Sequence, residues 1–148
     1  MEVKFYKTHP DAQLPKRNHG NLNIIGTGDT GYDIYAVSDC TIPPQGSGVI
    51  ETGIDVAYIE PGYWFLIAPR SGLGFKHSLQ PHLGTVDNPY RGNCSIKLYN
   101  FSTISYKVSK GDRIAQLIFF PLIEADVSWA DSIESTHRGA KNLGSSGK

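Results

Sequence analysis

The chain has 148 residues, the usual length of one compact domain, which argues against two domains joined by a linker. Hydrophobic residues make up 39% of the sequence and charged residues 19%, a composition that excludes disorder along the whole chain. The 14 Lys and Arg residues are balanced by 14 Asp and Glu residues, so there is no excess positive charge to hold a nucleic-acid backbone. A phosphate-containing ligand would have to bind at a local site.

The sequence carries no signal for a membrane or for secretion. Its longest apolar stretch, residues 114–123, includes Gln116 and Pro121 and is much shorter than the ~20 residues that span a bilayer. The N-terminus has no apolar segment followed by small residues, so we expect a cytoplasmic protein, in the host cytoplasm or nucleus if it is viral. In such a reducing compartment Cys40 and Cys94 are expected to be buried thiols.

Glycine and proline divide the chain into short segments. The chain has 16 glycines and 9 prolines, and breaks occur at residues 43–46, 61–62, 87–89 and 110–112. Between these breaks the residues alternate or are β-branched and aromatic, as is typical of strands, and the predicted strands are 4–6, 32–37, 49–57, 63–67, 95–99, 105–108 and 114–120. We therefore predict an all-β, jelly-roll-like barrel or sandwich, with one short helix at residues 73–77.

Three familiar catalytic patterns fail on their context. Residues 26–31 fit the dinucleotide motif GxGxxG, but a strand follows them where that motif needs a helix. Ser71 has no GxSxG elbow around it, which argues against a serine hydrolase. The histidines lack the spacing of protein zinc ligands and are expected on the surface or in loops: His9, His19, His77, His82 and His137.

Three polar clusters suit an anionic substrate. Residues 70–72 combine a guanidinium, a hydroxyl and backbone N–H groups, although Ser71 as a helix N-cap beside a surface arginine would explain them too. Residues 85–92 place Asp87 and Tyr90 around a tight turn, which could be a simple Asp-Asn-Pro turn. The tail, residues 138–148, is rich in Gly and Ser and has three cations and no acid, so it could wrap phosphates or be a frayed tail.

Taken together, five short segments occur in a specific order. They are residues 31–34, 69–73, 84–92, 111–117, and 138–139 with 144–147. In content, order and spacing they resemble the five motifs of the homotrimeric dUTP pyrophosphatase (dUTPase) family. The resemblance implies a β jelly roll at residues 1–137, a flexible phosphate-binding C-terminal arm at residues 138–148, and a homotrimer whose three active sites each use motifs from all three chains. The implied reaction is hydrolysis of dUTP to dUMP and pyrophosphate with Mg²⁺, which keeps uracil out of DNA and feeds dTMP synthesis.

The resemblance also assigns roles to single residues. Asp87 matches the carboxylate that deprotonates the water attacking the α-phosphorus, a role that suits a group ionised at neutral pH. Tyr90 matches the ring under deoxyribose that leaves no room for a 2′-hydroxyl. The backbone around Thr85, Val86 and Ser95 matches the hairpin edge that reads uracil.

The remaining assigned residues would handle the triphosphate and its metal ion. Asp33 would hold Mg²⁺ through water, with the ion bound mainly by the phosphates, and Asp112 would support the site from behind. The expected phosphate contacts are Arg70, Ser71, Gly72, Gln116, Arg138, Gly144, Ser145 and Ser146.

Three positions depart from the family pattern. Leu143 stands where an aromatic residue usually covers uracil. Residues 80–83 are bulkier than the small residues usual before the catalytic acid, which would change the wall of the uracil pocket. Asn88 and Pro89 replace an acid-containing turn and would shift Tyr90 slightly.

Two other interpretations stay open. A dCTP deaminase would share the fold and trimeric assembly, but it needs a glutamate near the base, and none of the candidates falls inside a matching motif: Glu51, Glu60, Glu124 and Glu134. A regulatory protein that binds dUTP is the other, although the presence of Asp87 and Arg138 favours an active hydrolase.

Overall fold

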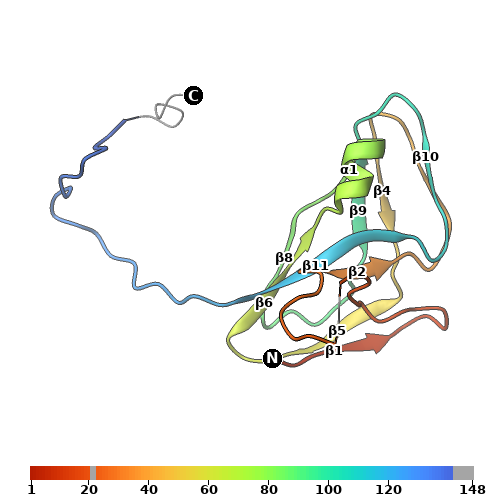
Figure 1. Ribbon diagram of the computed structural model, residues 1–148, viewed down its shortest axis with the longest axis horizontal. Coiled ribbons are helices and arrows are strands. Elements are labelled where there is room, and N and C mark those ends of the chain that lie inside the picture. The colour runs from red at the N-terminus through yellow and green to blue at the C-terminus, as the bar shows by residue number, and fades with distance from the viewer. Residues whose placement is uncertain (21–22, 142–148) are drawn as a thin grey trace.

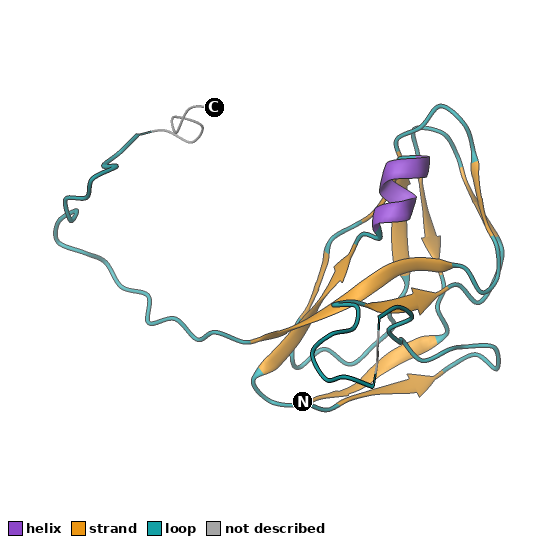
Figure 2. Ribbon diagram, in the orientation of Figure 1, coloured by secondary structure: helices purple, strands orange, loops and turns teal. Residues whose placement is uncertain are grey.

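The computed structural model describes residues 1–20 and 23–141, and these contain eleven strands and one short helix (Figures 1 and 2). The strands are β1 (Val3–Lys7), β2 (Tyr32–Tyr35), β3 (Cys40–Ile42), β4 (Ser47–Ile50), β5 (Ile54–Ile59), β6 (Tyr63–Ala68), β7 (Leu79–Pro81), β8 (Gly84–Val86), β9 (Ile96–Asn100), β10 (Tyr106–Val108) and β11 (Arg113–Pro121), and the helix is α1 (Ser71–His77). The predicted all-β class with one short helix is confirmed.

Antiparallel pairing joins these strands into four sheets. The largest has the order β2-β11-β6-β8, and a second has the order β4-β9-β7. Two further pairs are β1-β5 and β10-β3. In the largest sheet, Gln116 of β11 lies opposite Asp33 of β2 on one side and Ala68 of β6 on the other. One strand therefore brings together segments that are far apart in the sequence.

The core fills the space between the sheets. Ile34, Phe65, Leu98 and Leu117 are completely buried, and they come from β2, β6, β9 and β11. Side chains on a strand point alternately to its two faces, so the buried Ile96 and Leu98 of β9 leave Lys97 on the outer face. The apolar alternation that predicts the strands therefore also decides which polar residues of a strand stay outside the core.

Most differences from the predicted elements arise at short strands and at one glycine. The predicted strand 49–57 is two strands, β4 and β5, because Gly53 between them has a φ of 70°, in the left-handed region. The three-residue strands β3, β7 and β8 are absent from the predicted strands, whereas β10, also of three residues, lies within the predicted strand 105–108. The helix begins at Ser71, two residues before the predicted start.

A long exposed segment follows the last strand. The last strand ends at Pro121, and every described residue beyond it, 122–141, is exposed. Figure 1 shows this segment, which we call the arm, running away from the sheets. Val127, Trp129 and Ile133 on the arm are almost entirely exposed, so these apolar side chains find no packing partner on their own domain.

In the described ranges 1–20 and 23–141, no helix is long and apolar enough to cross a membrane.

The two cysteines differ in reactivity. Both are free thiols; Cys94 is buried as expected, whereas Cys40 is only half buried. Burial raises the pKa of the Cys94 thiol to about 12, so its reactive thiolate is scarce near neutral pH.

Iodoacetamide at pH 8 should therefore modify Cys40 before Cys94 in the folded protein, while both should react in denaturant. Mass spectrometry of peptides after a short exposure measures this order. Equal modification of the two thiols in the folded protein would contradict it.

Candidate active site

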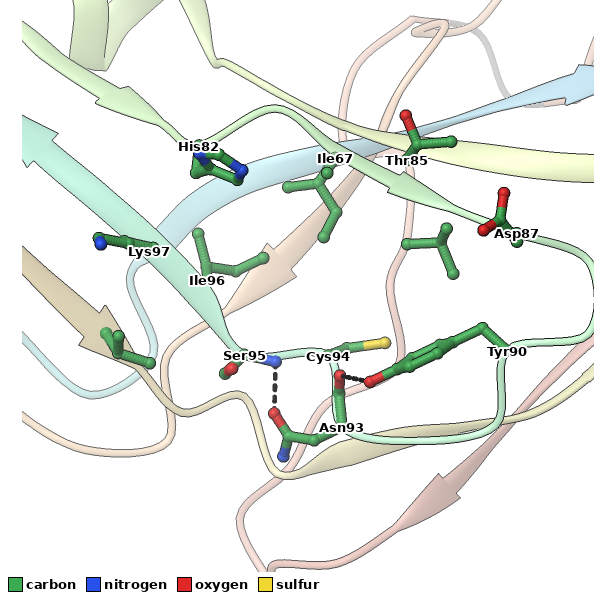
Figure 3. Close-up of a pocket in the computed structure, with 13 residues that line it drawn as sticks. Ile67, His82, Thr85, Asp87, Tyr90, Asn93, Cys94, Ser95, Ile96 and Lys97 are labelled. Carbon is green, nitrogen blue, oxygen red and sulfur yellow. Dashed lines mark hydrogen bonds between the residues drawn. The ribbon is translucent and has the colours of Figure 1, made fainter.

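The predicted site residues that the structure describes lie mainly in two cavities. The first, which we call the inter-sheet cavity, has a volume of about 290 Å³ and opens between β8 and β9 (Figure 3). Its lining residues are Val49, Ile67, His82, Gly84, Thr85, Val86, Asp87, Tyr90, Asn93, Cys94, Ser95, Ile96 and Lys97. The second, which we call the polar cavity, has a volume of about 220 Å³ and is lined by His19, Asp29, Thr30, Gly31, Asp33, Arg70, Ser71, Gly72 and Gln116.

The inter-sheet cavity exists because β8 and β9 belong to different sheets. The sequence interpretation treats them as a hairpin, but β8 pairs with β6, whereas β9 pairs with β4 and β7. The hairpin interpretation is therefore wrong in its pairing. β8 is an edge strand of its sheet, so one side of its backbone faces the cavity without a strand partner among the described residues. A planar ligand with donors and acceptors along its edge could hydrogen-bond there.

A tight turn places Asp87 and Tyr90 at one end of this cavity (Figure 3). The backbone N–H of Tyr90 donates to the carbonyl of Asp87 at 3.0 Å, and the Tyr90 hydroxyl donates to the carbonyl of Asn93 at 2.8 Å. A Cβ on Gly92 would lie 2.8 Å from the Tyr90 hydroxyl oxygen, so the ring position requires glycine there. The Asp87 carboxylate is exposed and hydrogen-bonds no other described side chain or backbone group, which leaves it available to a ligand or to water.

Asn88 explains one departure from the family pattern. Its amide Nδ2 donates to the carbonyls of Glu60 and Tyr63, each at 2.9 Å, and lies 3.4 Å from the carbonyl of Ile59. These contacts fasten the turn that carries Asp87 to the loop between β5 and β6. A carboxylate at this position could not donate to the carbonyls, so the amide suits this turn.

The bulkier residues 80–83 also have a structural place. His82 lines the inter-sheet cavity, and its Nδ1 lies 3.1 Å from the hydroxyl of Tyr99. Its backbone N–H donates to the carbonyl of Lys97 at 2.8 Å. The imidazole therefore forms part of the cavity wall.

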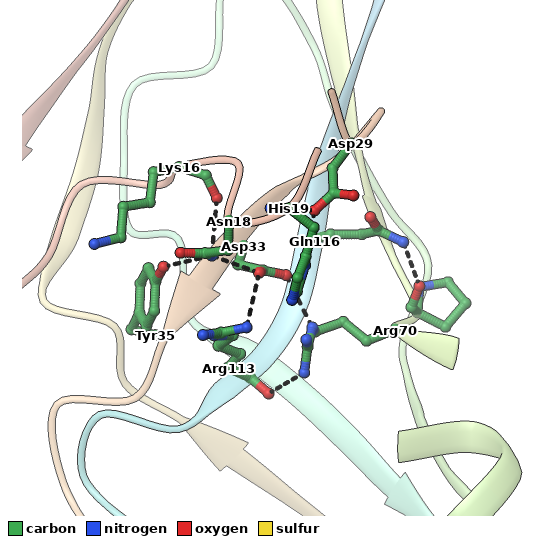
Figure 4. A network of polar contacts seen from close by, with 10 residues as sticks. Lys16, Asn18, His19, Asp29, Asp33, Tyr35, Arg70, Arg113 and Gln116 are labelled. Carbon is green, nitrogen blue, oxygen red and sulfur yellow. Dashed lines mark hydrogen bonds and ion pairs between the residues drawn. The ribbon is translucent and has the colours of Figure 1, made fainter. Parts of the chain in front are cut away.

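An ion-pair network forms one wall of the polar cavity (Figure 4). The Arg70 Nε donates to Oδ1 of Asp33 at 2.8 Å, and the side chain of Asp33 is only 9% exposed. The other carboxylate oxygen accepts a hydrogen bond from Asn18 at 2.6 Å and lies 3.9 Å from Arg113. Arg70 also contacts the carbonyl of Arg113 at 3.4 Å. The guanidinium of Arg70 is thus held at the cavity in a fixed orientation.

Three further residues line the same cavity: Ser71, Gly72 and Gln116. Arg70 occupies the N-cap position of α1 without a side-chain cap, so the alternative in which Ser71 caps the helix is wrong. The Ser71 hydroxyl hydrogen-bonds no other described residue, and a Cβ on Gly72 would meet nothing within 4 Å. The Nε2 of Gln116 donates to the carbonyl of Pro69 at 2.8 Å, which fixes that side chain beside Ser71.

The structure does not bring all of the predicted residues together. The two cavities share no lining residue, so one chain does not assemble Asp87 and Tyr90 with Arg70, Ser71 and Gln116. Arg138 lies on the exposed arm, and the predicted contacts Leu143, Gly144, Ser145 and Ser146 lie outside the described residues. Asp112 accepts the N–H of Ser109 at 2.8 Å and shapes the turn before β11.

The sequence interpretation missed three residues of the polar cavity. His19, Asp29 and Thr30 line it, although none of the five motifs includes them. The run of glycines at residues 26–31 is the only local signal, and it marks the loop that leads into β2.

A bound metal would find few protein ligands in this chain. Residues 1–20 and 23–141 contain no group of three His, Cys, Asp or Glu side chains that could hold an ion. Asp33 borders the polar cavity, but both of its oxygens already accept hydrogen bonds. Each oxygen keeps a second lone pair, which could accept a hydrogen bond from a metal-bound water.

Comparison of the sequence with known proteins identifies the family of this chain. The dUTPase family profile matches residues 21–147. The chain belongs to the dUTPase family.

Among curated dUTPases, a Kluyveromyces lactis deoxyuridine 5'-triphosphate nucleotidohydrolase is 41% identical over 140 residues, which cover 93% of this chain and 88% of that protein. A probable one from Schizosaccharomyces pombe is 36% identical and covers 99% of both. The human mitochondrial enzyme is also 36% identical over this entire chain, which spans 56% of the human protein's length.

Solved dUTPase structures share the architecture. A variant of the Staphylococcus bacteriophage 80alpha dUTPase with dUpNHpp superposes with a TM-score of 0.84 at 29% identity, covering 99% of both chains. A variant of the dUTPase from phage phi11 of S. aureus, described as coordinating a structural Mg(II) ion, superposes with a TM-score of 0.76 at 25% identity and covers 91% of this chain and all of that one. The jelly-roll-like fold is therefore the fold of the family.

In this dUTPase, replacing Asn88 by Asp should destabilise the fold by about 1–3 kcal/mol. The carboxylate would face the carbonyls of Glu60 and Tyr63 and could donate to neither. Urea unfolding at neutral pH measures the loss, and Asn88→Ala, which adds no negative charge, should lose less. A variant Asn88→Asp as stable as the wild type would show that this anchor is dispensable.

Proposed function

We propose that the chain hydrolyses dUTP to dUMP and pyrophosphate, with Asp87 activating the water that attacks the α-phosphorus. Membership in the dUTPase family supports the activity, because the curated relatives are named deoxyuridine 5'-triphosphate nucleotidohydrolases. The same names favour hydrolysis over the deaminase alternative. The exposed Asp87 carboxylate in the inter-sheet cavity is the observation in this chain that best supports the proposed mechanism.

The inter-sheet cavity would hold the nucleoside. Donors and acceptors on the open backbone edge of β8 would pair with the uracil edge, while Ile67 and Ile96 supply apolar walls. Tyr90 would lie against the deoxyribose, where its hydroxyl bond to Asn93 and the absent Cβ of Gly92 keep the ring in place. A ring held in this way leaves no space for a ribose 2′-hydroxyl.

Asp87 would then act on the phosphate end of the nucleotide. It lies at the same end of the cavity as Tyr90, so a nucleotide with its sugar on Tyr90 presents its α-phosphate to the carboxylate (Figure 3). The water loses a proton to Asp87 as its oxygen bonds to the α-phosphorus and the bond to the pyrophosphate oxygen breaks. Deprotonation by a positioned base typically contributes about 10²- to 10⁴-fold to the rate.

The polar cavity would hold the phosphates beyond the α-phosphate. Arg70 supplies a fixed positive charge, Ser71 a hydroxyl, and Gly72 space for a close approach of phosphate to the backbone. Asp33 would accept a hydrogen bond from a water on Mg²⁺, which the phosphates themselves bind. When bound, the ion neutralises charge that develops on the leaving pyrophosphate.

Three chains would complete each active site. The division of the residues between two cavities supports this assembly, because Asp87 needs the polar groups that its own chain places elsewhere. The arm supports it as well: its apolar residues Val127, Trp129 and Ile133 are exposed in the single chain and would be buried on a second copy. We propose a homotrimer in which Arg138 and the residues after it reach the phosphates of another chain's site.

A purely regulatory role remains the weaker alternative. A structural study of the phage 80alpha dUTPase describes phage dUTPases as controlling the transfer of virulence genes. The free Asp87 carboxylate in this chain favours an active enzyme, with or without such a role. The cytoplasmic location stays a prediction.

Replacing Asp87 by Asn should lower kcat by about 10²- to 10⁴-fold and leave the affinity for a non-hydrolysable dUTP analogue nearly unchanged. The amide keeps the shape of the side chain but cannot take the proton. Release of pyrophosphate and calorimetric binding measure the two effects, with Asp39→Asn as the control because Asp39 lies in neither cavity. A variant that keeps more than about a third of the wild-type kcat would rule out Asp87 as the base.

Mixing two inactive variants tests the shared site. The Asp87→Asn variant and a chain truncated before Arg138 should each be nearly inactive, and the truncated chain keeps Trp129 and Ile133 for assembly. After joint unfolding and refolding in equal amounts, about a quarter of the sites should contain both an intact Asp87 and an intact arm if these come from different chains. No gain in activity, with mixed trimers confirmed by mass, would mean that each chain supplies both groups itself.

A further inference from the structure

The loop before β2 contributes a histidine–aspartate pair to the polar cavity. The Nδ1 of His19 lies 3.0 Å from Oδ2 of Asp29, and the same oxygen accepts the backbone N–H of His19 at 3.0 Å. The loop is closed independently, because the backbone N–H of Asp29 donates to the carbonyl of His19 at 3.2 Å. The side-chain contact is therefore additional to the backbone hydrogen bond that joins the two residues. It orients an imidazole whose side chain is 65% exposed.

This pair decides which ring nitrogen is available to a ligand. Because the Asp29 carboxylate accepts, Nδ1 carries a hydrogen, and Nε2 can donate to a ligand when the ring is in its doubly protonated imidazolium form. Nε2 has no hydrogen-bond partner among the described residues. Figure 4 shows the pair beside Gln116, and His19 and Arg70 both line the polar cavity.

We propose that His19, positioned by Asp29 and carrying a hydrogen on both ring nitrogens in the complex, donates a hydrogen bond from Nε2 to the terminal phosphates of the nucleotide. This inference rests on the proposed function, since Asp87 places the α-phosphate at the inter-sheet cavity and leaves the later phosphates for the polar cavity. The imidazole adds a donor on the side of the cavity formed by the loop, where Asp29 and Thr30 are the neighbouring lining residues. A nucleoside monophosphate would not reach it.

A single substitution separates the two ends of the ring. In His19→Asn the amide Nδ2 takes the place of Nδ1 and can still donate to Asp29, so the loop contact survives while the Nε2 end is lost. Calorimetry with a non-hydrolysable dUTP analogue should show about tenfold weaker binding, as expected for loss of one charge-assisted hydrogen bond, while binding of dUMP stays unchanged. Asp29→Asn should give a smaller loss with the same preference for the triphosphate.

A matched control comes from the same N-terminal region. His9 accepts the backbone N–H of Asp11 at 3.1 Å through Nδ1 and lines neither cavity, so His9→Asn should change neither affinity. Equal weakening of dUMP and the analogue in His19→Asn would indicate a structural role only, and no weakening of the analogue would exclude the contact. Absence of dUTP hydrolysis by the wild-type protein would overturn the proposed function, whereas the loss specific to the triphosphate analogue would still support the His19 contact.

Discussion

The antiparallel pairing of β11 with both β2 and β6 is the constraint on which the rest of the site depends. It sets Gln116 opposite Asp33 on one side and opposite Ala68 on the other. Ala68 is two residues before Arg70 in the sequence. The short Arg70–Asp33 contact then connects β2 to the segment that follows β6. The same guanidinium also donates a hydrogen bond to the carbonyl of Arg113 on β11. A shift of β11 by one residue would turn Gln116 to the opposite face and bury a polar amide in the core. The polar cavity therefore depends directly on the register of the sheet.

The single chain holds each half of the site rigidly and leaves the two halves apart. Asn88 fastens the turn with Asp87 to the β5–β6 loop, and the Asp33 network fastens Arg70, but no lining residue belongs to both cavities. In the proposed mechanism, a second chain brings phosphates and nucleoside into one place, and positioning of this kind provides much of the rate in phosphoryl transfer. The exposed apolar residues of the arm provide a driving force for such an assembly, because burying apolar surface stabilises it by about 25 cal/mol per Å².

The sequence predicts those elements that have a local pattern, and it does not predict contacts between distant segments. The strand β9, whose burial alternates, and the strand β6, which is a continuous apolar run, are found to within about one residue at each end, because burial of their side chains imposes these patterns. The three-residue strands β3 and β7 are held by pairing with distant strands, which no local pattern records. The same holds for the site: the motifs give its residue types, but the pairing of β8 with β6, the anchor at Asn88 and the His19–Asp29 pair are contacts between separate segments.

The glycines of the motifs show why the motifs occur as a set. A Cβ at Gly31 would lie 1.9 Å from the Oε1 of Gln116, so the glycine before β2 is required by a side chain that stands on β11. Gly92 is required in the same way by the Tyr90 ring. Neither glycine has a positive φ, so the requirement comes from the space that a neighbouring side chain occupies and not from backbone strain. A Cβ at either glycine would therefore displace a side chain that lines a cavity, Gln116 in the polar cavity or Tyr90 in the inter-sheet cavity.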